Sequence, residues 1–244
     1  MVVLYGSAAG LTGARAQLFR QDLPQMVDRA EVGDAFGAAL AAGDLNGDGH
    51  SDLVAGVPGE AVGTAAGGPS TAGDRLFYQG AGGLPDEPEV ADGFGSALAV
   101  GDLDGDAFPD LAIGVPGEEY FANLDVGDAT LLHGTAGGLS GTGSQSLILE
   151  VNNVGSNESG DHIGGALAAR DFDTDGAGDL VVGMPREDID KLRDAGAVAY
   201  HQGPLQGPDF SECRPLHADS AVVPGAAERG DRFGSVLGPG PLGG

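Results

Sequence analysis

Short apolar runs bounded by glycine alternate with acidic loops along this chain, and the same order returns three times. The run before each loop begins with Phe-Gly or Ile-Gly, and the run after it ends in Gly-x-Pro. Runs of this length and composition predict β-strands that are buried on both faces. The first runs span 36–43, 94–101 and 163–170, and the second runs span 53–58, 111–116 and 180–185.

Two further strands are expected in each unit. Alternating apolar and polar positions predict a third strand at 73–80, 127–134 and 196–203. A weaker signal predicts a fourth strand near 87–90, 146–151 and 218–223. No segment has the pattern of a long amphipathic helix, and a repeated unit of four antiparallel strands is typical of propeller blades. The sequence therefore predicts an all-β fold, a β-propeller of four-stranded antiparallel blades.

The two ends of the chain fit partial blades. Residues 1–6 match the third strand of a unit, so the chain is expected to begin halfway through a blade. Residues 231–234 restart a unit, and Pro241 then stands where the first loop has Asp44. We expect a single propeller region over 1–244, apparently partial, with about three whole blades and two partial ones. The partial blade 1–30 comes first, followed by blades at about 31–90, 91–151 and 152–223 and by the partial blade 224–244.

Each acidic loop has nine residues and places oxygen-bearing side chains at positions 1, 3, 5 and 9. Calcium takes six to eight oxygen ligands, so this spacing predicts about three Ca2+ sites. Position 7 varies in side chain, as expected if it ligates through its backbone carbonyl. Glycine at position 6 suits a tight turn, but the second loop has Ala107 there and Pro109 at position 8. The expected ligands are Asp44, Asn46, Asp48, His50 and Asp52; Asp102, Asp104, Asp106, Phe108 and Asp110; and Asp171, Asp173, Asp175, Ala177 and Asp179.

Two alternatives to these calcium sites follow from the residues. An EF-hand needs a bidentate acid at position 12 and helical flanks. Position 12 here is Ala55, Ile113 or Val182, and the flanks are strand-like, so this alternative is disfavoured. The other alternative is an acidic turn held by Asx-type hydrogen bonds without any metal.

Charge and composition exclude several classes of function. The formal net charge is −26, from 37 acidic and 11 basic residues, which disfavours nucleic acid and anionic lipid as partners. Three calcium ions would reduce this charge only to −20. The lone Cys213 excludes an internal disulfide, and no apolar run reaches the ~18 residues of a membrane span.

Phe-Gly, the Asp-x-Asp/Asn-x-Asp-Gly-x-x-Asp loop and Gly-x-Pro together resemble FG-GAP repeats, as in the integrin α-subunit β-propeller. The resemblance implies an extracellular or cell-surface, calcium-stabilised module for adhesion or binding of a protein or cell-surface ligand, without catalysis. It also implies that the calcium loops line one face and that ligands use the opposite face. Because such propellers usually have about seven blades, self-association or a missing chain segment would complete this one. The alternatives are the propeller portion of a secreted, phospholipase-like hydrolase, or a structural spacer in a larger surface protein.

The remaining motifs favour no further chemistry. Arg229-Gly230-Asp231 spells an integrin-binding tripeptide, but Asp231 occupies the repeat position of Asp34, Asp92 and Asp161. Residues 238–243 match a dinucleotide fingerprint but contain two prolines, and no helix is expected after them. Asn157 begins a glycosylation sequon, and Lys191-Leu192-Arg193 is the densest basic spot, interpreted as a solvated turn. The five histidines form no HExxH pattern, and there is no Gly-x-Ser-x-Gly elbow.

Overall fold

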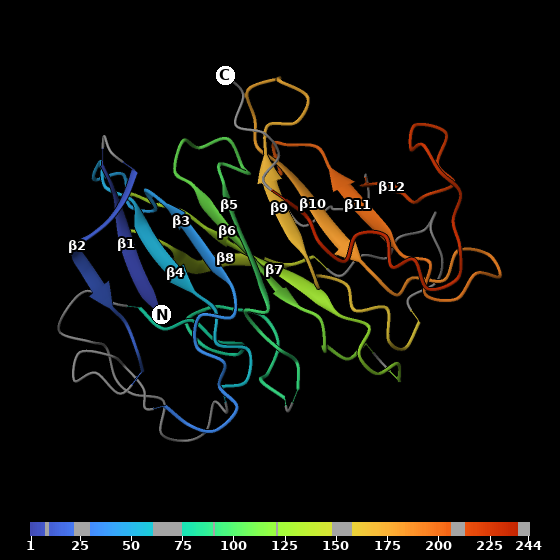
Figure 1. Cartoon of the computed structure of the whole chain (residues 1–244), viewed down its shortest axis with the longest axis horizontal. Helices are drawn as coiled ribbons and strands as arrows, with labels where there is room; N and C mark the ends of the chain where they lie inside the picture. Colours follow the sequence, from blue (N-terminus) through green and yellow to red (C-terminus); the bar gives the residue numbers. More distant parts are fainter. Residues whose placement is uncertain are drawn as a thin grey trace.

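The protein is a series of antiparallel β-sheets that follow one another in sequence order, as the computed structural model shows (Figure 1). The structure describes residues 1–7, 10–21, 30–60, 75–89, 91–120, 122–147, 158–205 and 213–238. These residues form strands, turns and bends without a helix, so none of them belongs to a helix that could cross a membrane. The strands are β1 (Val2–Ser7), β2 (Gly10–Leu18), β3 (Leu40–Gly43), β4 (Asp52–Ala55), β5 (Ala97–Gly101), β6 (Asp110–Val115), β7 (Asp128–His133), β8 (Ser140–Ser146), β9 (Leu167–Arg170), β10 (Asp179–Met184), β11 (Ala197–His201) and β12 (Cys213–Leu216).

Two of the sheets are complete four-stranded blades. Strands β5 to β8 form the second blade and strands β9 to β12 the third, each in simple up-and-down order with antiparallel neighbours. The first blade consists of β3 and β4, and β1 and β2 form a separate hairpin. The first strands of successive blades, β3, β5 and β9, lie side by side, so the blades fan out from one edge. The prediction of an all-β, partial propeller is confirmed.

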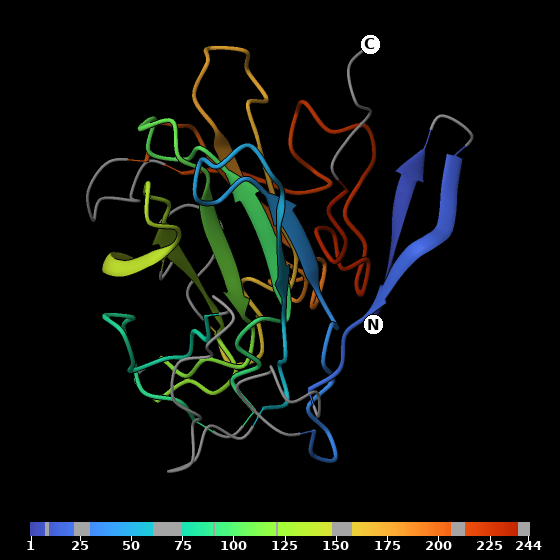
Figure 2. The same cartoon turned by 90° about the vertical axis from the view of Figure 1, so that its left-hand side faces the viewer.

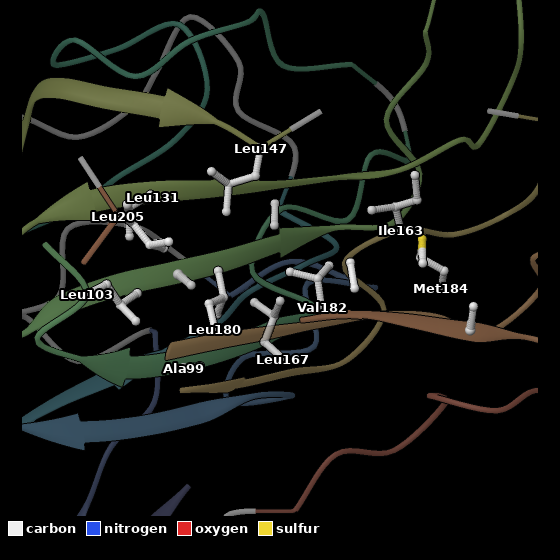
Figure 3. Close-up of a cluster of buried hydrophobic side chains, with 14 of the residues drawn as sticks. Ala99, Leu103, Leu131, Leu147, Ile163, Leu167, Leu180, Val182, Met184 and Leu205 are labelled. Carbon is white, nitrogen blue, oxygen red and sulfur yellow. The ribbon is translucent and has the colours of Figure 1, made fainter. Parts of the chain in front are cut away.

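The hydrophobic core lies between the blades rather than within one sheet. Figure 3 shows leucine and valine side chains of the third blade, such as Leu180 and Val182, facing Leu103 and Leu131 of the second. A second cluster joins the first two blades through Leu45, Leu111 and Leu132, among others. Burial of these side chains stabilises the fold by roughly 1.5–3 kcal/mol for each large one. The core therefore holds neighbouring units together and fixes their loops relative to each other.

Glycine at Gly-x-Pro has a structural role in this packing. A Cβ on Gly114 would lie 2.0 Å from the carbonyl oxygen of Gly164, which belongs to the Ile-Gly pair of the next unit. Gly56 has the same relation to Gly95, and Gly183 to Gly234, at 2.0 and 2.2 Å. The glycine of one unit therefore receives the backbone of the next, and Gly234 repeats this contact at the end of the third blade.

The outer strands depart from the sequence prediction. The fourth strands are β8 and β12, which lie earlier than the predicted 146–151 and 218–223. Strand β8 reads Ser-Gly-Thr-Gly-Ser-Gln-Ser and is mostly half-buried at the edge of its sheet, so its sequence carries no apolar pattern. Residues 218–223 form turns instead, with the Ser220 hydroxyl accepting from the His217 amide. In the first unit, residues 75–78 and 87–89 are not strands, whereas residues 73–74, 90 and 148–151 lie outside the described part.

One face of the first blade lacks the cover that the other blades have. Leu53 is 42% exposed, whereas the corresponding Leu111 and Leu180 are 1% and 0% exposed. Leu40 is 50% exposed, whereas the corresponding Leu98 is half-buried and Leu167 is 7% exposed. These corresponding leucines pack against the preceding blade. Figure 2 shows the β1–β2 hairpin standing away from the other sheets rather than lying across this face. The face is therefore an apolar surface shaped to pack against another blade.

Candidate metal-binding loops

The three acidic loops join the first and second strands of the three blades. Each loop is closed by the last pair of its ladder, Gly43 with Asp52, Gly101 with Asp110 and Arg170 with Asp179. Neighbouring loops touch, because the Gly178 amide donates to the Asp102 carbonyl at 2.9 Å and a Cβ on Gly47 would lie 3.2 Å from the Phe108 ring. The loops therefore lie together at one end of the blades.

The aspartate at position 9 is the buried anchor of each loop. Asp110 and Asp179 are fully buried, and Asp52 is half-buried. One carboxylate oxygen accepts from the amide at position 2 in all three loops, at 3.0, 2.8 and 2.7 Å. The other oxygen of Asp110 and of Asp179 accepts from the glycine after the third strand, at 2.9 Å in both cases. Burial raises the pKa of the Asp110 carboxyl, opposed by these backbone donors.

The side chains at positions 1, 3 and 5 fold back on the loop backbone in the same way each time. Position 1 accepts from the amide of position 6 at 2.8, 3.1 and 3.1 Å in the three loops. Position 3 accepts from the amide of position 5 at 2.9, 3.0 and 3.1 Å, and position 5 accepts from that of position 7 at 2.8, 2.8 and 2.9 Å. The chain thus builds one turn three times from different residues.

Two positions of each loop have left-handed backbone conformations. Position 4 has φ values of 71°, 80° and 65° at Gly47, Gly105 and Thr174. Position 6 has φ values of 86° and 96° at Gly49 and Gly176, as expected for glycine, and 73° at Ala107. The second loop therefore keeps the shared turn even though its residue at position 6 carries a Cβ.

Replacing Ala107 by glycine is expected to stabilise the protein by about 0.5–1 kcal/mol. A left-handed residue with a Cβ costs roughly 1–2 kcal/mol, and the greater freedom of glycine in the unfolded chain offsets part of the gain. The check is the midpoint of urea unfolding at fixed calcium, with Gly176→Ala as the reverse substitution at the equivalent position. A stabilising Gly176→Ala would contradict this account of the turn.

The carboxylates of the second and third loops lie close enough to share an ion. The sets Asp102, Asp104, Asp106 and Asp171, Asp173, Asp179 each offer oxygens within 4.8 Å of one another. Among the described residues the first loop offers no comparable set of three, in keeping with Asn46 at its position 3. Asp171 Oδ1 is buried and accepts no hydrogen bond from the residues that the structure describes, although Asp171 Oδ2 accepts one. An unsatisfied buried carboxylate oxygen among other carboxylates fits a hard cation such as calcium.

Sequence analysis missed a side chain that reaches each of two loops from the end of the third strand. The His133 Nδ1 atom lies 3.0 Å from Asp104 Oδ2, and the Gln202 amide donates to Asp173 Oδ2 at 2.5 Å. Both residues immediately precede the glycine that binds the position-9 aspartate. The sequence marks these two side chains only by their position immediately before that glycine. Neither belongs to the spaced oxygen-ligand pattern of the loops, so sequence analysis did not identify them.

The opposite end of the blades holds a second repeated feature. In Asp34, Asp92, Asp161 and Asp231 the carboxylate accepts from the amide of a glutamate three residues earlier, at 2.5, 2.6, 2.6 and 2.7 Å. Asp231 therefore has a structural partner of the same kind as the other three, which supports reading Arg229-Gly230-Asp231 as part of the repeat. The sequon residue Asn157 lies outside the described residues.

Two buried glutamates at this end have side-chain pKa values raised above the ordinary range. Burial raises the pKa of Glu118 to about 8, with a further contribution from Asp86. Burial raises the pKa of Glu187 also to about 8, with nearby Asp161 and Glu158 adding to the effect. Each glutamate follows Gly-x-Pro by two residues, so the repeat places a carboxyl group in the same buried position.

Unfolding free energy is expected to fall as pH rises from 6.5 to 8.5. The folded state holds protons on Glu118 and Glu187 that the unfolded state releases near pH 4.5, so raising the pH through 8 favours unfolding. Glu187→Gln should make this pH dependence shallower, as measured by urea unfolding at constant saturating calcium. An unchanged slope in the variant would show that Glu187 is ionised in the folded state.

The sequence of this chain is similar to a known repeat family and to several known proteins. Residues 36–72 and 94–127 match the FG-GAP repeat family. Integrin alpha-3 of Cricetulus griseus is 34% identical over 128 residues, covering 47% of this chain and 11% of that protein. Phosphatidylinositol-glycan-specific phospholipase D is 36% identical over 115 residues in Bos taurus, covering 46% of this chain and 14% of that protein. The Homo sapiens phospholipase is 31% identical over 184 residues, covering 69% of this chain and 21% of that protein.

The chain therefore spans only about a tenth to a fifth of the length of these relatives. The repeats, the four-stranded antiparallel blades and the similarity to integrin alpha subunits agree with one another. The chain contains FG-GAP repeats, and its blades form a partial, integrin-like propeller.

Proposed function

We propose that this chain is a calcium-stabilised propeller module that binds a protein or cell-surface ligand outside the cell and performs no catalysis. The observation that carries the calcium proposal is the turn shared by the three loops, which in the second and third loops brings three carboxylates within reach of one ion. As domain organisation we propose one propeller region over 1–244, with partial blade 1–30, blades at about 31–90, 91–151 and 152–223, and partial blade 224–244.

The proposed ligands of each ion are the side chains at positions 1, 3, 5 and 9 and the backbone carbonyl at position 7. When bound, calcium would supply positive charge that offsets the repulsion among these carboxylates. The chain contributes the preformed turn, because backbone amides already hold one oxygen of each side chain in place. Hydrogen bonding to the backbone and metal binding are therefore compatible, and the metal-free acidic turn is the state from which calcium binding starts.

Equilibrium dialysis followed by elemental analysis tests the calcium proposal. We expect about three calcium ions per chain, and two after Asp48→Ala in the first loop. Asp219→Ala serves as a control, because Asp219 lies outside the loops and accepts a hydrogen bond from the Ala227 amide. A wild-type chain that retains no calcium would sink the proposal.

The ligand role is supported by the similarity to integrin alpha-3, and the opposite end of the blades from the calcium loops is the proposed ligand face. Similarity to phosphatidylinositol-glycan-specific phospholipase D favours the second candidate, the propeller portion of a hydrolase. One experiment separates them, in which cells are exposed to the purified chain in calcium. Attachment that protease treatment of the cells abolishes supports a protein ligand, whereas release of glycan-anchored proteins into the medium supports the hydrolase. A chain that does neither fits a structural spacer.

We also propose that another blade covers the exposed face at Leu40 and Leu53, supplied by further sequence or by a second copy. The support is the burial of Leu111 and Leu180, which correspond to Leu53 in the other two blades. Analytical ultracentrifugation distinguishes the two sources by measuring the mass in solution. A dimer that Leu53→Glu converts to a monomer indicates a second copy. A monomeric wild-type chain leaves further sequence as the source.

A further inference from the structure

The second loop differs from the others in having a nitrogen ligand within reach of its carboxylates. His133 is the last residue of β7, and its Nδ1 atom lies 3.0 Å from Asp104 Oδ2 and 3.6 Å from Asp110 Oδ1. These three side chains form a set whose ligand atoms lie within 4.8 Å of one another. The Nδ1 atom is buried and makes no hydrogen bond of good geometry with the described residues.

The surroundings hold the two carboxylates in place. Asp104 Oδ1 accepts from the Asp106 amide at 3.0 Å, and Oδ2 faces the imidazole. Asp110 is fully buried, and its Oδ1 accepts from the Gly134 amide at 2.9 Å. Gly134 directly follows His133, so the hydrogen bond that anchors the loop also fixes the backbone beside the histidine. The three groups are thus positioned by the sheet and not only by the exposed part of the loop.

The distances suit a small divalent ion. Four ligands at 2.0–2.1 Å around tetrahedral zinc are separated from each other by roughly 3.3–3.4 Å. The two distances from the His133 nitrogen, 3.0 and 3.6 Å, fall on either side of that value. Neutral imidazole is a preferred ligand for zinc and related ions, whereas calcium prefers oxygen.

We propose that the second loop is a site for a divalent transition-metal ion of the zinc type, bound by His133 Nδ1, Asp104 and Asp110. Because Asp104 and Asp110 also belong to the expected calcium ligands, the two ions compete for this loop. This inference goes beyond the calcium role, and it distinguishes one loop from two others that share its turn.

The third loop provides a comparison within the same chain. Gln202 takes the place of His133 there, and its amide nitrogen donates to Asp173 Oδ2. The NH2 group of a glutamine side chain donates hydrogen bonds and does not ligate metal ions, so the third loop offers oxygen ligands alone. In the first unit the corresponding Gln79 donates instead to Glu118 at the other end of the blade, at 2.5 Å. An imidazole nitrogen placed in this way beside the carboxylates is therefore specific to the second loop.

Calorimetric titration of the whole chain with Zn2+, without calcium and then with calcium in excess, tests the proposal. We expect one site that calcium weakens by competition, and His133→Gln should weaken zinc binding at least about tenfold, since even outer-shell substitutions at zinc sites cost 10–100-fold. Gln202→His should add a second site of the same kind. His217→Gln is the matched control, because His217 follows β12 and lies outside all three acidic loops.

Spectroscopy and calcium counting complete the test. Substitution with Co2+ should give visible absorption bands that His133→Gln removes, while the number of bound calcium ions stays unchanged in that variant. Zinc binding that survives His133→Gln unaltered would overturn the proposal, and a chain that binds no zinc would leave His133 as an ion-pair partner of Asp104. Loss of calcium binding with zinc binding intact would refute the calcium function alone.

Discussion

Asp179→Ala is expected to lower the free energy of unfolding by about 2–5 kcal/mol both in calcium and in chelator. Asp179 is fully buried and accepts from the amides of Phe172 and Gly203 at 2.7 and 2.9 Å. Removal of the carboxylate leaves two backbone donors without a partner, and each buried unsatisfied donor costs about 1–3 kcal/mol. Urea unfolding at two calcium concentrations measures the loss.

Asp175→Ala is the matched control, because it removes another expected ligand of the same ion. Asp175 is exposed and accepts one amide hydrogen bond, from Ala177 at 2.9 Å. We expect this variant to lose stability in calcium and to change by less than about 0.5 kcal/mol in chelator, as for most exposed positions. If both variants behave alike in chelator, position 9 does not have the anchoring role assigned to it.

Gly114→Ala is expected to destabilise the protein by about 3 kcal/mol or more, which is at or above the usual range for overpacking. The added Cβ would lie 2.0 Å from the Gly164 carbonyl oxygen and 3.2 Å from the Ala97 Cβ. Since the nearest atom belongs to the backbone of the next unit, the third blade must move away from the second. The urea midpoint should fall accordingly, and side-chain packing between the blades should weaken.

Gly13→Ala provides the control for Gly114→Ala. Gly13 lies in β2, a Cβ there would meet nothing within 4 Å, and its backbone is not left-handed. A change within about 0.5 kcal/mol is expected. Equal effects of the two substitutions would contradict the role of Gly-x-Pro glycines as the contact between blades.

The parts of the fold that could be predicted are those in which burial dictates the sequence. The first two strands of each unit are apolar because neighbouring blades cover both faces, so their positions follow from the pattern around each loop. The loops were predictable because their turn uses the same side chain at each hydrogen-bonded position. Ala107 looked like a departure, but it adopts a φ of 73° and preserves the turn.

The outer strands and the contacts between units could not be predicted in the same way. Strand β8 is polar and mostly half-buried, and β12 contains Pro215, which is tolerated at a sheet edge. Neither strand has to bury an apolar face, so neither has a periodic signal. His133 and Gln202 reach the loops from strands that are distant in sequence, and only the folded blade brings them there.

The motif residues are spread along the unit because they make two kinds of contact. Phe-Gly and Gly-x-Pro meet between units, whereas the acidic loop closes within a unit. Each blade thus depends on its neighbour for packing and on its own loop for closure. Stabilisation of one loop should consequently spread to the adjoining blade through the shared core.

Thermal unfolding at calcium concentrations from chelator to 10 mM tests the central claim most directly. Each site filled to 100 times its dissociation constant adds about 2.7 kcal/mol. For a chain of this size 1 kcal/mol shifts Tm by about 2–4 °C, so three sites should raise Tm by at least about 10 °C. Magnesium should raise it less, because Mg2+ releases its bound waters reluctantly. An identical Tm in chelator and in 10 mM calcium would contradict the account and leave three acidic turns held by hydrogen bonds alone.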